Sequence, residues 1–349
     1  MRWSGQQVAT ADVAGALPGL ARLPGLVRTT RTPEFAGMTF YEVDAKSALN
    51  RVPGHVPGTP YRWTINPYRG CSHACVYCFA RPTHRYLEFD DPAAFDAEVV
   101  VKVNLAEVLR AELHRRTWQR EPVALGTNTD PYQRAEGRYG LMPGVIAALA
   151  ESGTPVSLLT KGSLLRRDLP LLAEAAERVP VDLAMSIAIM DPRLQEEVEP
   201  GTPTAAARLA TVRAARDAGL TCGVFLMPVL PFLTDTVEHL DRALGEIADA
   251  GASYVVWTTL YLKPGVREWW SAWLQRTHPD LLPRYERLYS SGAYAPPAYR
   301  RWLADRIEPL IARHGLVRGA VDSATGTVRS RSAGIVRAVV DSSTQPTLF

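Results

Sequence analysis

Short apolar runs alternate with longer amphipathic stretches through the middle of the chain. The apolar runs are rich in β-branched and aromatic residues, which favour strands, and the amphipathic stretches repeat at helical spacing. Six predicted strands cover residues 62–66, 122–127, 156–160, 181–189, 221–227 and 254–261. Six predicted helices cover residues 104–116, 143–151, 165–178, 203–218, 236–250 and 268–275. This alternation predicts βα units built around a parallel sheet.

Residues that start and stop helices support these boundaries. Pro143 and Pro203 suit the first turn of a helix, and Gly153 and Gly219 suit helix exits. Residues 99–103 are ambiguous and form a candidate extra strand. The pattern predicts an α/β protein with a partial (β/α)6 TIM barrel, in which polar groups at the carboxyl ends of the strands carry the chemistry.

The chain before the predicted barrel has a different texture. Residues 1–60 contain repeated Pro-Gly pairs, which mark turns, and lack a periodic apolar pattern. We expect an extended N-terminal arm with little regular structure, apart from a short helix near 45–49. Residues 61–265 then form the predicted barrel core.

The chain after the barrel begins with an aromatic segment. Trp269, Trp270 and Trp273 lie at helical spacing within residues 266–315, which we expect to form a helical cap on the barrel. As an alternative, these rings stack on nucleic-acid bases beside basic residues. Residues 316–349 are rich in Gly, Ser and Thr, and we expect a disordered tail.

Composition narrows the class of protein. Of the 349 residues 46% are hydrophobic, enough for a large core, and a net charge of +3 permits an anionic substrate without demanding one. The sequence shows neither an apolar run of membrane-spanning length nor a signal-peptide pattern. It has four cysteines, three of them close together, which argues against a disulfide framework and for a cytoplasmic, reducing location.

The three clustered cysteines are the strongest chemical signal. Cys71, Cys75 and Cys78 follow the spacing C-x3-C-x2-C. Thiolates suit iron–sulfur clusters or zinc, and three local ligands leave one coordination position open for chemistry. Two alternatives stay open: a zinc loop completed by His73 or His84, and a chance grouping of buried thiols.

The residues around the cysteines also suit a metal-binding loop. Gly70 permits a tight backbone turn, and Arg69 and Arg81 are expected to bring positive charge to crowded thiolates. The loop resembles that of the radical S-adenosylmethionine (SAM) superfamily. The resemblance implies a [4Fe-4S] cluster held by the three cysteines, with SAM on the fourth iron and Tyr77 packed near its adenine.

Polar residues follow several predicted strands at the expected active edge. Asp130 is a candidate acceptor from the ammonium or ribose of SAM, and Thr129 supplements it. Lys161 is a candidate partner of the carboxylate or ribose, and Ser186 of the ribose. Arg208, in the helix after the fourth strand, is a second candidate carboxylate partner because a guanidinium matches carboxylate geometry.

Longer motifs narrow the resemblance. Those typical of the spore photoproduct lyase-like branch of radical SAM proteins are Arg69-Gly-Cys, Thr129-Asp-Pro-Tyr-Gln133, Thr160-Lys161, Glu199-Pro-Gly201 and Pro228-x-x-Pro231. Those that resemble an actinobacterial radical SAM family within that branch are Trp63-Thr-Ile-Asn-Pro-Tyr-Arg-Gly-Cys71, Cys78-Phe-Ala-Arg-Pro-Thr-His84 and Gly126-Thr-Asn-Thr-Asp-Pro-Tyr-Gln-Arg-Ala-Glu136. None of these motifs is tied to one reaction.

One departure from the lyase pattern concerns the hydrogen donor. In the lyase a cysteine just ahead of the matching Thr/Ser-Asp pair returns a hydrogen atom to the product, whereas this chain has Thr127 and Asn128 there. We expect the remaining Cys222 to be a buried core thiol. Tyr132 is the candidate hydrogen relay in place of the missing cysteine.

The resemblance implies an enzyme that cleaves SAM reductively to a 5′-deoxyadenosyl radical, which abstracts hydrogen from a substrate. The electron comes from an external donor of the flavodoxin or ferredoxin type. Analogy with the lyase favours nucleic acid as substrate, in repair or modification, over a small molecule or peptide. The non-enzyme alternative is an iron–sulfur or zinc-binding redox sensor.

Overall fold

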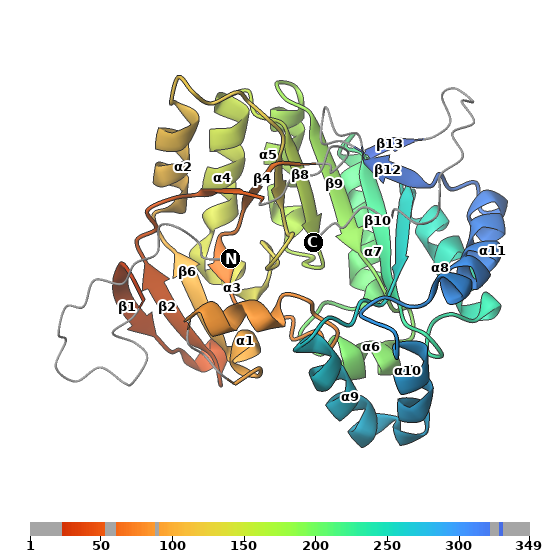
Figure 1. Cartoon of the computed structure of the whole chain (residues 1–349). Helices are drawn as coiled ribbons and strands as arrows, with labels where there is room; N and C mark the ends of the chain where they lie inside the picture. Colours follow the sequence, from red (N-terminus) through yellow and green to blue (C-terminus); the bar gives the residue numbers. More distant parts are fainter. Residues whose placement is uncertain (1–22, 53–60, 88–90, 322–327, 331–349) are drawn as a thin grey trace.

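The fold is built on a large sheet whose parallel strands are those predicted. The computed structural model describes residues 23–52, 61–87, 91–321 and 328–330. Within these residues the larger sheet has the order β11-β10-β9-β8-β7-β4-β3 (Figure 1). Its strands are β3 (Leu49–Arg51), β4 (Trp63–Ile65), β7 (Val123–Leu125), β8 (Val156–Thr160), β9 (Val181–Ser186), β10 (Cys222–Val229) and β11 (Val255–Thr259). Each neighbouring pair from β4 to β11 is parallel, which confirms the six predicted strands.

Helices follow these strands as predicted. The matching helices are α2 (Leu105–Leu113), α4 (Leu141–Glu151), α5 (Leu165–Ala176), α7 (Ala205–Asp217), α8 (Val237–Asp249) and α9 (Val266–Thr277). Pro203 lies just before α7, whose first turn is capped by Thr204. Several shorter helices were not predicted: α1 (Ala94–Ala97), α3 (Arg134–Tyr139), α6 (Pro192–Val198) and the 3-10 helix η3 (Arg81–Leu87).

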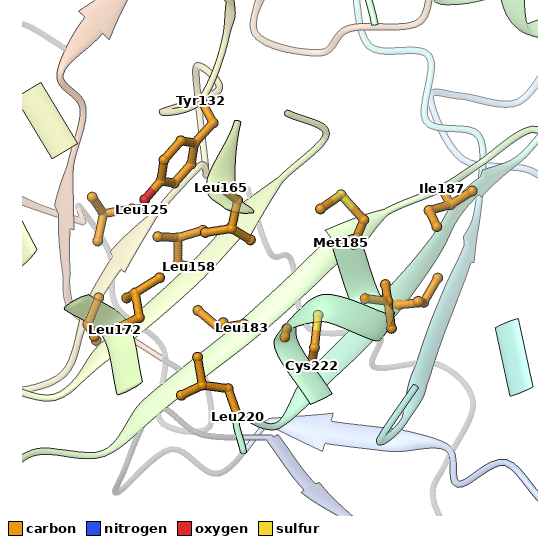
Figure 2. Close-up of a cluster of buried hydrophobic side chains, with 14 of the residues drawn as sticks. Leu125, Tyr132, Leu158, Leu165, Leu172, Leu183, Met185, Ile187, Leu220 and Cys222 are labelled. Atoms are coloured by element: carbon orange, nitrogen blue, oxygen red, sulfur yellow. The ribbon is translucent and has the colours of Figure 1, made fainter. Parts of the chain in front are cut away.

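The main core lies between the sheet and its covering helices. Leu158 and Leu183 of the sheet pack against Leu165 and Leu172 of α5 (Figure 2). Cys222, at the start of β10, belongs to the same core and is 1% exposed, as expected for a structural thiol. A buried sheet of this kind explains why the strands read as continuous apolar runs in the sequence.

The N-terminal arm contains more regular structure than expected. β1 (Leu26–Thr30), β2 (Thr39–Val43), β6 (Glu98–Lys102) and β5 (Tyr68–Arg69) form a second sheet in the order β1-β2-β6-β5. The helix expected near 45–49 is wrong, because Glu112 accepts hydrogen bonds from the backbone N–H groups of Ala48 and Leu49 where β3 begins. The candidate strand at 99–103 is confirmed as β6. Residues 1–22 and 53–60 of the arm lie outside the described residues.

The C-terminal helices pack on the carboxyl ends of β10 and β11. Besides α9 they include η4 (Pro279–Leu281), α10 (Leu282–Leu288) and α11 (Pro297–Arg313). In α10 and just after it, Tyr285 donates a hydrogen bond to the Pro231 carbonyl and Tyr289 to the Leu260 carbonyl. Trp270 and Trp273 are 0% and 5% exposed in this packing, so the alternative in which they stack on bases is wrong.

The expectation of a disordered tail from residue 316 is wrong for its described part. β12 (Gly319–Val321) pairs with β13 (Val328–Ser330), and the Val317 carbonyl accepts a hydrogen bond from the Val255 N–H on β11. Residues 322–327 and 331–349 lie outside the described residues. In the described part of the chain, every helix is too short or too polar to cross a membrane.

Candidate active site

The three cysteines lie in one loop that leaves the end of β5. All three are free thiols, and the Cys71 N–H donates to the Phe95 carbonyl at 2.8 Å. The turn into the loop needs a glycine, since Gly70 has φ of 85° and an added Cβ would lie 2.7 Å from the Glu98 carbonyl oxygen. The sequence reading of Gly70 as a turn residue is therefore confirmed.

A glutamine from the loop after β7 fixes the start of the cysteine loop. The Gln133 Oε1 atom accepts from the Ser72 N–H at 2.9 Å, and its Nε2 atom donates to the Gly70 carbonyl at 3.0 Å. Gln133 is fully buried. The Gln133 amide thus supplies an acceptor for the Ser72 N–H and a donor for the Gly70 carbonyl, in place of backbone partners within the loop.

The loop between α6 and α7 fixes the other side of the cysteine loop. The Gly201 N–H donates to the His73 carbonyl at 3.1 Å, and the Val76 N–H donates to the Val198 carbonyl at 2.9 Å. A Cβ on Gly201 would lie 1.9 Å from the Ser72 carbonyl oxygen, so this close approach requires glycine. The Glu199-Pro-Gly201 motif therefore has a packing role against the cysteine loop.

Burial opposes thiolate formation in the loop, and nearby cations favour it. Burial raises the pKa of Cys78 to about 11 and that of Cys75 well above its ordinary value. Arg81 opposes the shift at Cys78, and Lys161 opposes it at Cys75. Lys263 also lies within electrostatic reach of Cys78. The nearby cationic side chains therefore favour ionised thiolates, the form in which cysteine binds a metal, against the effect of burial.

Arg81 is held in place beside the loop by several contacts. It pairs with Asp96 at 2.8 Å, donates to the Cys75 carbonyl at 3.1 Å and lies over the Trp269 ring at 4.4 Å. Trp269 therefore supports the loop instead of offering a free aromatic face. Arg69 is the other arginine expected to supply charge here. Its positive charge lowers the pKa of His84 and of Lys102.

The two histidines near the cysteines have other partners. The His73 Nδ1 atom lies 3.3 Å from Asp130 Oδ2. Burial alone would lower the pKa of His73, but Asp130 and Cys71 raise it to about 10, so the ring is protonated near neutral pH. The His84 Nε2 atom is 2.8 Å from the Glu98 carbonyl oxygen. In each ring one nitrogen faces a protein acceptor, an arrangement that is also found in metal-ligating histidines, so the zinc alternative stays open.

Glu199 connects the cysteine loop with the residues after β8 and β9. Its carboxylate accepts a hydrogen bond from the Tyr77 hydroxyl, pairs with Arg208 at 2.7 Å and lies 3.6 Å from Lys161 Nζ. Burial would raise the pKa of Glu199, but Arg208 and Lys161 lower it to about 2. The carboxylate is therefore ionised and holds three side chains together.

Four of the predicted SAM contacts come together beside the cysteine loop. Lys161 Nζ lies 2.5 Å from Ser186 Oγ and 5.6 Å from the centre of the Tyr77 ring. Asp130 is adjacent, because its carboxylate accepts from the Lys161 N–H at 2.6 Å and from Thr160 Oγ1 at 2.5 Å. Tyr77, Lys161, Ser186 and Asp130 thus form one polar cluster next to Cys75.

Two other predicted contacts have structural partners. The Thr129 hydroxyl donates to the Tyr68 carbonyl at 2.8 Å, toward β5. Arg208 is fully buried and, besides Glu199, donates to the Ser186 carbonyl at 3.0 Å. Its guanidinium therefore orients Glu199 and Ser186, and a SAM carboxylate would have to displace one of these partners.

Tyr132, the candidate hydrogen relay, lies on the core side of the strand ends. Its ring lies in the hydrophobic core beside Leu125 and Leu158 (Figure 2). Its hydroxyl donates to Asp168 at 3.0 Å, and Asp168 also pairs with Arg167. The hydroxyl is thus committed to a buried ion pair on the core side of the strand ends.

Sequence reasoning missed the roles of Gln133, Glu199 and Gly201. All three lie inside motifs that carried the resemblance, but the motifs alone did not say what each side chain contacts. His73 was considered only as a metal ligand. No local pattern marks the role of Glu199, because its contact with Tyr77 spans 122 residues.

Comparisons with known proteins agree with this geometry. The model of the Radical SAM superfamily matches residues 65–258. An uncharacterised protein of Mycobacterium tuberculosis is 60% identical over 319 residues, covering 90% of this chain and 93% of that protein. A protein of Methanocaldococcus jannaschii is 25% identical over 199 residues, covering 57% of this chain and 70% of its own length.

Solved structures show the same fold at low sequence identity. A spore photoproduct lyase variant superposes with a TM-score of 0.60 at 16% identity, covering 79% of each chain. Spore photoproduct lyase complexed with dinucleoside spore photoproduct gives a TM-score of 0.59 at 15% identity, with 79% of each chain covered. The matched superfamily region contains the cysteine loop and the polar cluster. This chain therefore belongs to the Radical SAM superfamily.

Proposed function

We propose that this protein is a radical SAM enzyme in which Cys71, Cys75 and Cys78 hold a [4Fe-4S] cluster. The observation that carries the proposal is the placement of three free thiols in one glycine-turned loop, directly beside the cluster of Tyr77 and Lys161. Among the described residues, no group of three or more His, Cys, Asp or Glu side chains is arranged so that it could hold a metal ion. The support for the ligands is their number, spacing and surrounding charge.

The donor set fits such a cluster better than the alternatives. Three soft ligands leave one iron free for a further ligand, and the fourth cysteine, Cys222, is buried in the main core. Lys161, Arg81 and Lys263 surround the loop with positive charge, which compensates the negative charge of a thiolate-ligated cluster.

The polar cluster next to the loop suits the bound SAM. Lys161 and Ser186 present an ammonium and a hydroxyl to a carboxylate or ribose, and the Tyr77 ring offers an apolar face to the adenine. Asp130 holds the backbone of Lys161 and the ring of His73, so it orients the site even where it does not touch the ligand. Thr129 and Arg208 help to position the same site by donating hydrogen bonds to the Tyr68 and Ser186 carbonyls.

When bound, the reduced cluster and SAM supply a 5′-deoxyadenosyl radical, together with methionine, for hydrogen abstraction from a substrate. The protein contributes orientation and exclusion of water. An external donor of the flavodoxin or ferredoxin type supplies the electron. The surrounding loops hold Tyr77 and Lys161 rigidly through Glu199, which favours one orientation of the ligand.

For the substrate we favour nucleic acid over a small molecule or peptide. The support is the fold shared with spore photoproduct lyase, one structure of which is complexed with a dinucleoside photoproduct. Tyr132 is buried, and residues 127–128 include no thiol. This chain therefore differs from the lyase in the residues that could return a hydrogen atom to the product. We therefore propose modification or repair by a route that does not use those positions.

Anaerobic reconstitution of matched cysteine variants tests the proposal. We expect the wild type and Cys222→Ala to bind about four irons per chain and to form 5′-deoxyadenosine with dithionite and SAM, since cubane clusters of this class hold four irons. Cys75→Ala is expected to lose both properties. A Cys75→Ala protein that still cleaves SAM refutes the ligand assignment. Deuterated candidate substrates then identify the substrate by transfer of label into 5′-deoxyadenosine.

A further inference from the structure

A lysine from the far end of the larger sheet lies beside the cysteine loop. Lys263 follows β11, and its Nζ atom is 5.6 Å from the centre of the Phe79 ring, in the residue directly after Cys78. The side chain is half-buried. Among the described residues Cys78 acts electrostatically on Lys263, and no carboxylate does. The ammonium group is thus brought to the Cys78 side of the loop by a segment distant in the sequence.

The backbone around Lys263 fixes this position. The Lys263 carbonyl accepts a hydrogen bond from the Val266 N–H at 3.0 Å, at the start of α9. The N-cap of α9 is Gly265, where an added Cβ would lie 3.1 Å from the Pro82 Cγ atom in η3. Val266 is buried in one hydrophobic cluster with Cys75. The turn that carries Lys263 is therefore packed against the segment that carries the cysteines.

Two other cationic side chains beside the loop have carboxylate partners. Arg81 pairs with Asp96 at 2.8 Å, and Lys161 lies 3.6 Å from Glu199. Lys263 differs from both, since no hydrogen bond or ion pair joins its side chain to another residue in the described part of the chain. A carboxylate next to a cation cancels much of its effect on a third charge. The charge of Lys263 is not cancelled in this way.

We propose that Lys263 raises the reduction potential of the cluster that the three cysteines hold. The inference rests on the proposed function, because it requires that cluster. One electron passes from the external donor to the bound cluster, and no bond forms or breaks in the protein. The added negative charge means that a fixed cation stabilises the reduced state more than the oxidised state. Because Lys263 is half-buried, its charge is screened less by salt than that of an exposed lysine.

This role differs from that of Lys161. Lys161 belongs to the polar cluster proposed for SAM, where it contacts Ser186 and the Tyr77 ring. The ring contact of Lys263 is with Phe79, outside that polar cluster. The effect of Lys263 on reduction is therefore expected with SAM absent, which separates it from any change in SAM binding.

The structural alternative is that Lys263 only packs on Phe79. The distance of 5.6 Å is close to the outer limit of about 6 Å for a contact between a cation and an aromatic ring. A packing role predicts that Lys263→Met changes the free energy of unfolding and leaves the potential of the bound cluster unchanged. The reduction potential therefore distinguishes the two roles.

A redox titration of the anaerobically reconstituted full-length protein tests the proposal. Electron paramagnetic resonance follows the fraction of reduced cluster at a series of fixed potentials, without SAM. We expect the equilibrium constant for reduction to fall about tenfold in Lys263→Met, which corresponds to a midpoint potential about 59 mV more negative. Lys263→Arg keeps the charge and should stay within about twofold of the wild type. The control Lys46→Met removes an exposed lysine and should also stay within about twofold.

Iron and acid-labile sulfide per chain are measured for every variant, so that a change in potential is separated from a change in assembly. Lys263→Gln is the second neutral variant and is expected to match Lys263→Met. Equal midpoint potentials in the wild type and both neutral variants, at equal iron content, overturn this inference alone. Loss of iron in both neutral variants assigns the charge to assembly and also overturns it. A wild type that binds no iron refutes the proposed function, and this inference with it.

Discussion

Arg208 and Glu199 form an ion pair at 2.7 Å in which neither side chain is exposed to solvent. The pair lies behind the cysteine loop and the polar cluster, and it reaches both through Tyr77 and Lys161. Buried pairs of this kind contribute little net stability over apolar packing, but they are costly to break. We therefore interpret it as a device that fixes the geometry of the site.

We predict that Glu199→Gln destabilises the protein by about 3–5 kcal/mol, because it leaves Arg208 buried without a counter-ion. The double variant Glu199→Gln/Arg208→Met is expected to recover part of this loss. Equilibrium urea unfolding measures both changes. As a control, Glu174→Gln breaks an exposed pair with Arg178, whose side chains are 59% and 56% exposed, and should cost less than about 0.5 kcal/mol. Equal losses in the two single variants would contradict this interpretation.

We predict that Gly201→Ala impairs cluster assembly more than folding. The added Cβ would lie 1.9 Å from the Ser72 carbonyl oxygen, so the cysteine loop must move to accommodate it. Iron and acid-labile sulfide per chain, measured after anaerobic reconstitution, should fall well below wild type. The control Gly137→Ala meets only the Leu164 Cδ2 atom at 3.8 Å and should assemble normally. Wild-type iron content in Gly201→Ala would show that the contact does not position the loop.

The sequence predicted the larger sheet because its strands are buried on both faces. Such strands are continuous apolar runs, and the six predicted ones appear in the structure as neighbours. The smaller sheet was harder to predict, since β1 is mostly polar and β5 has two residues. β2 and β5 both pair with β6, which is distant in the sequence from β2.

Only part of the candidate site was predicted, because contacts between residues distant in the sequence leave no local pattern. Spacing alone pointed to Cys71, Cys75 and Cys78, because ligands within one loop leave a local pattern. The contact between Tyr77 and Glu199 spans 122 residues, and that between Ser72 and Gln133 spans 61, so neither leaves such a pattern. Arg208 was predicted as a partner of the SAM carboxylate, and in the structure it pairs with the carboxylate of Glu199.

We predict that His84 makes the stability of the cluster-free protein depend on pH in mildly acidic solution. Burial, with Arg69 and Arg81 nearby, lowers the pKa of His84 from 6.5 to about 4. Between these values the unfolded chain binds a proton that the folded protein does not, so stability falls as the pH is lowered from 6.5 toward 4. The slope contributed by one such group is about 1.4 kcal/mol per pH unit at most.

Urea unfolding at several pH values measures this dependence. The variant His84→Gln keeps an N–H donor for the Glu98 carbonyl but does not titrate, so its stability should fall less steeply over the same range. The exposed His114 provides the control, and His114→Gln is expected to retain the wild-type slope. A wild-type slope in His84→Gln would mean that other groups cause the acid sensitivity.

We predict that the tryptophans of the C-terminal cap stabilise the fold by packing, and that Trp270 contributes more to stability than Trp302. Trp270 is fully buried against Trp273 and Tyr285, and Trp270→Ala should cost about 3–5 kcal/mol in urea unfolding. Trp302 is 38% exposed and stacks with Tyr299 under Arg306, and Trp302→Ala should cost about 1 kcal/mol or less.

The same residues distinguish packing from nucleic-acid binding. Because the Trp270 ring does not reach solvent, the conservative Trp270→Phe variant should leave any affinity for a single-stranded oligonucleotide unchanged. A base that stacked on this ring would have to displace Tyr285, whose hydroxyl is held by the Pro231 carbonyl. A large loss of oligonucleotide affinity in Trp270→Phe, with stability near that of the wild type, would mean that the cap opens to expose this ring. The cap would then belong to the substrate site.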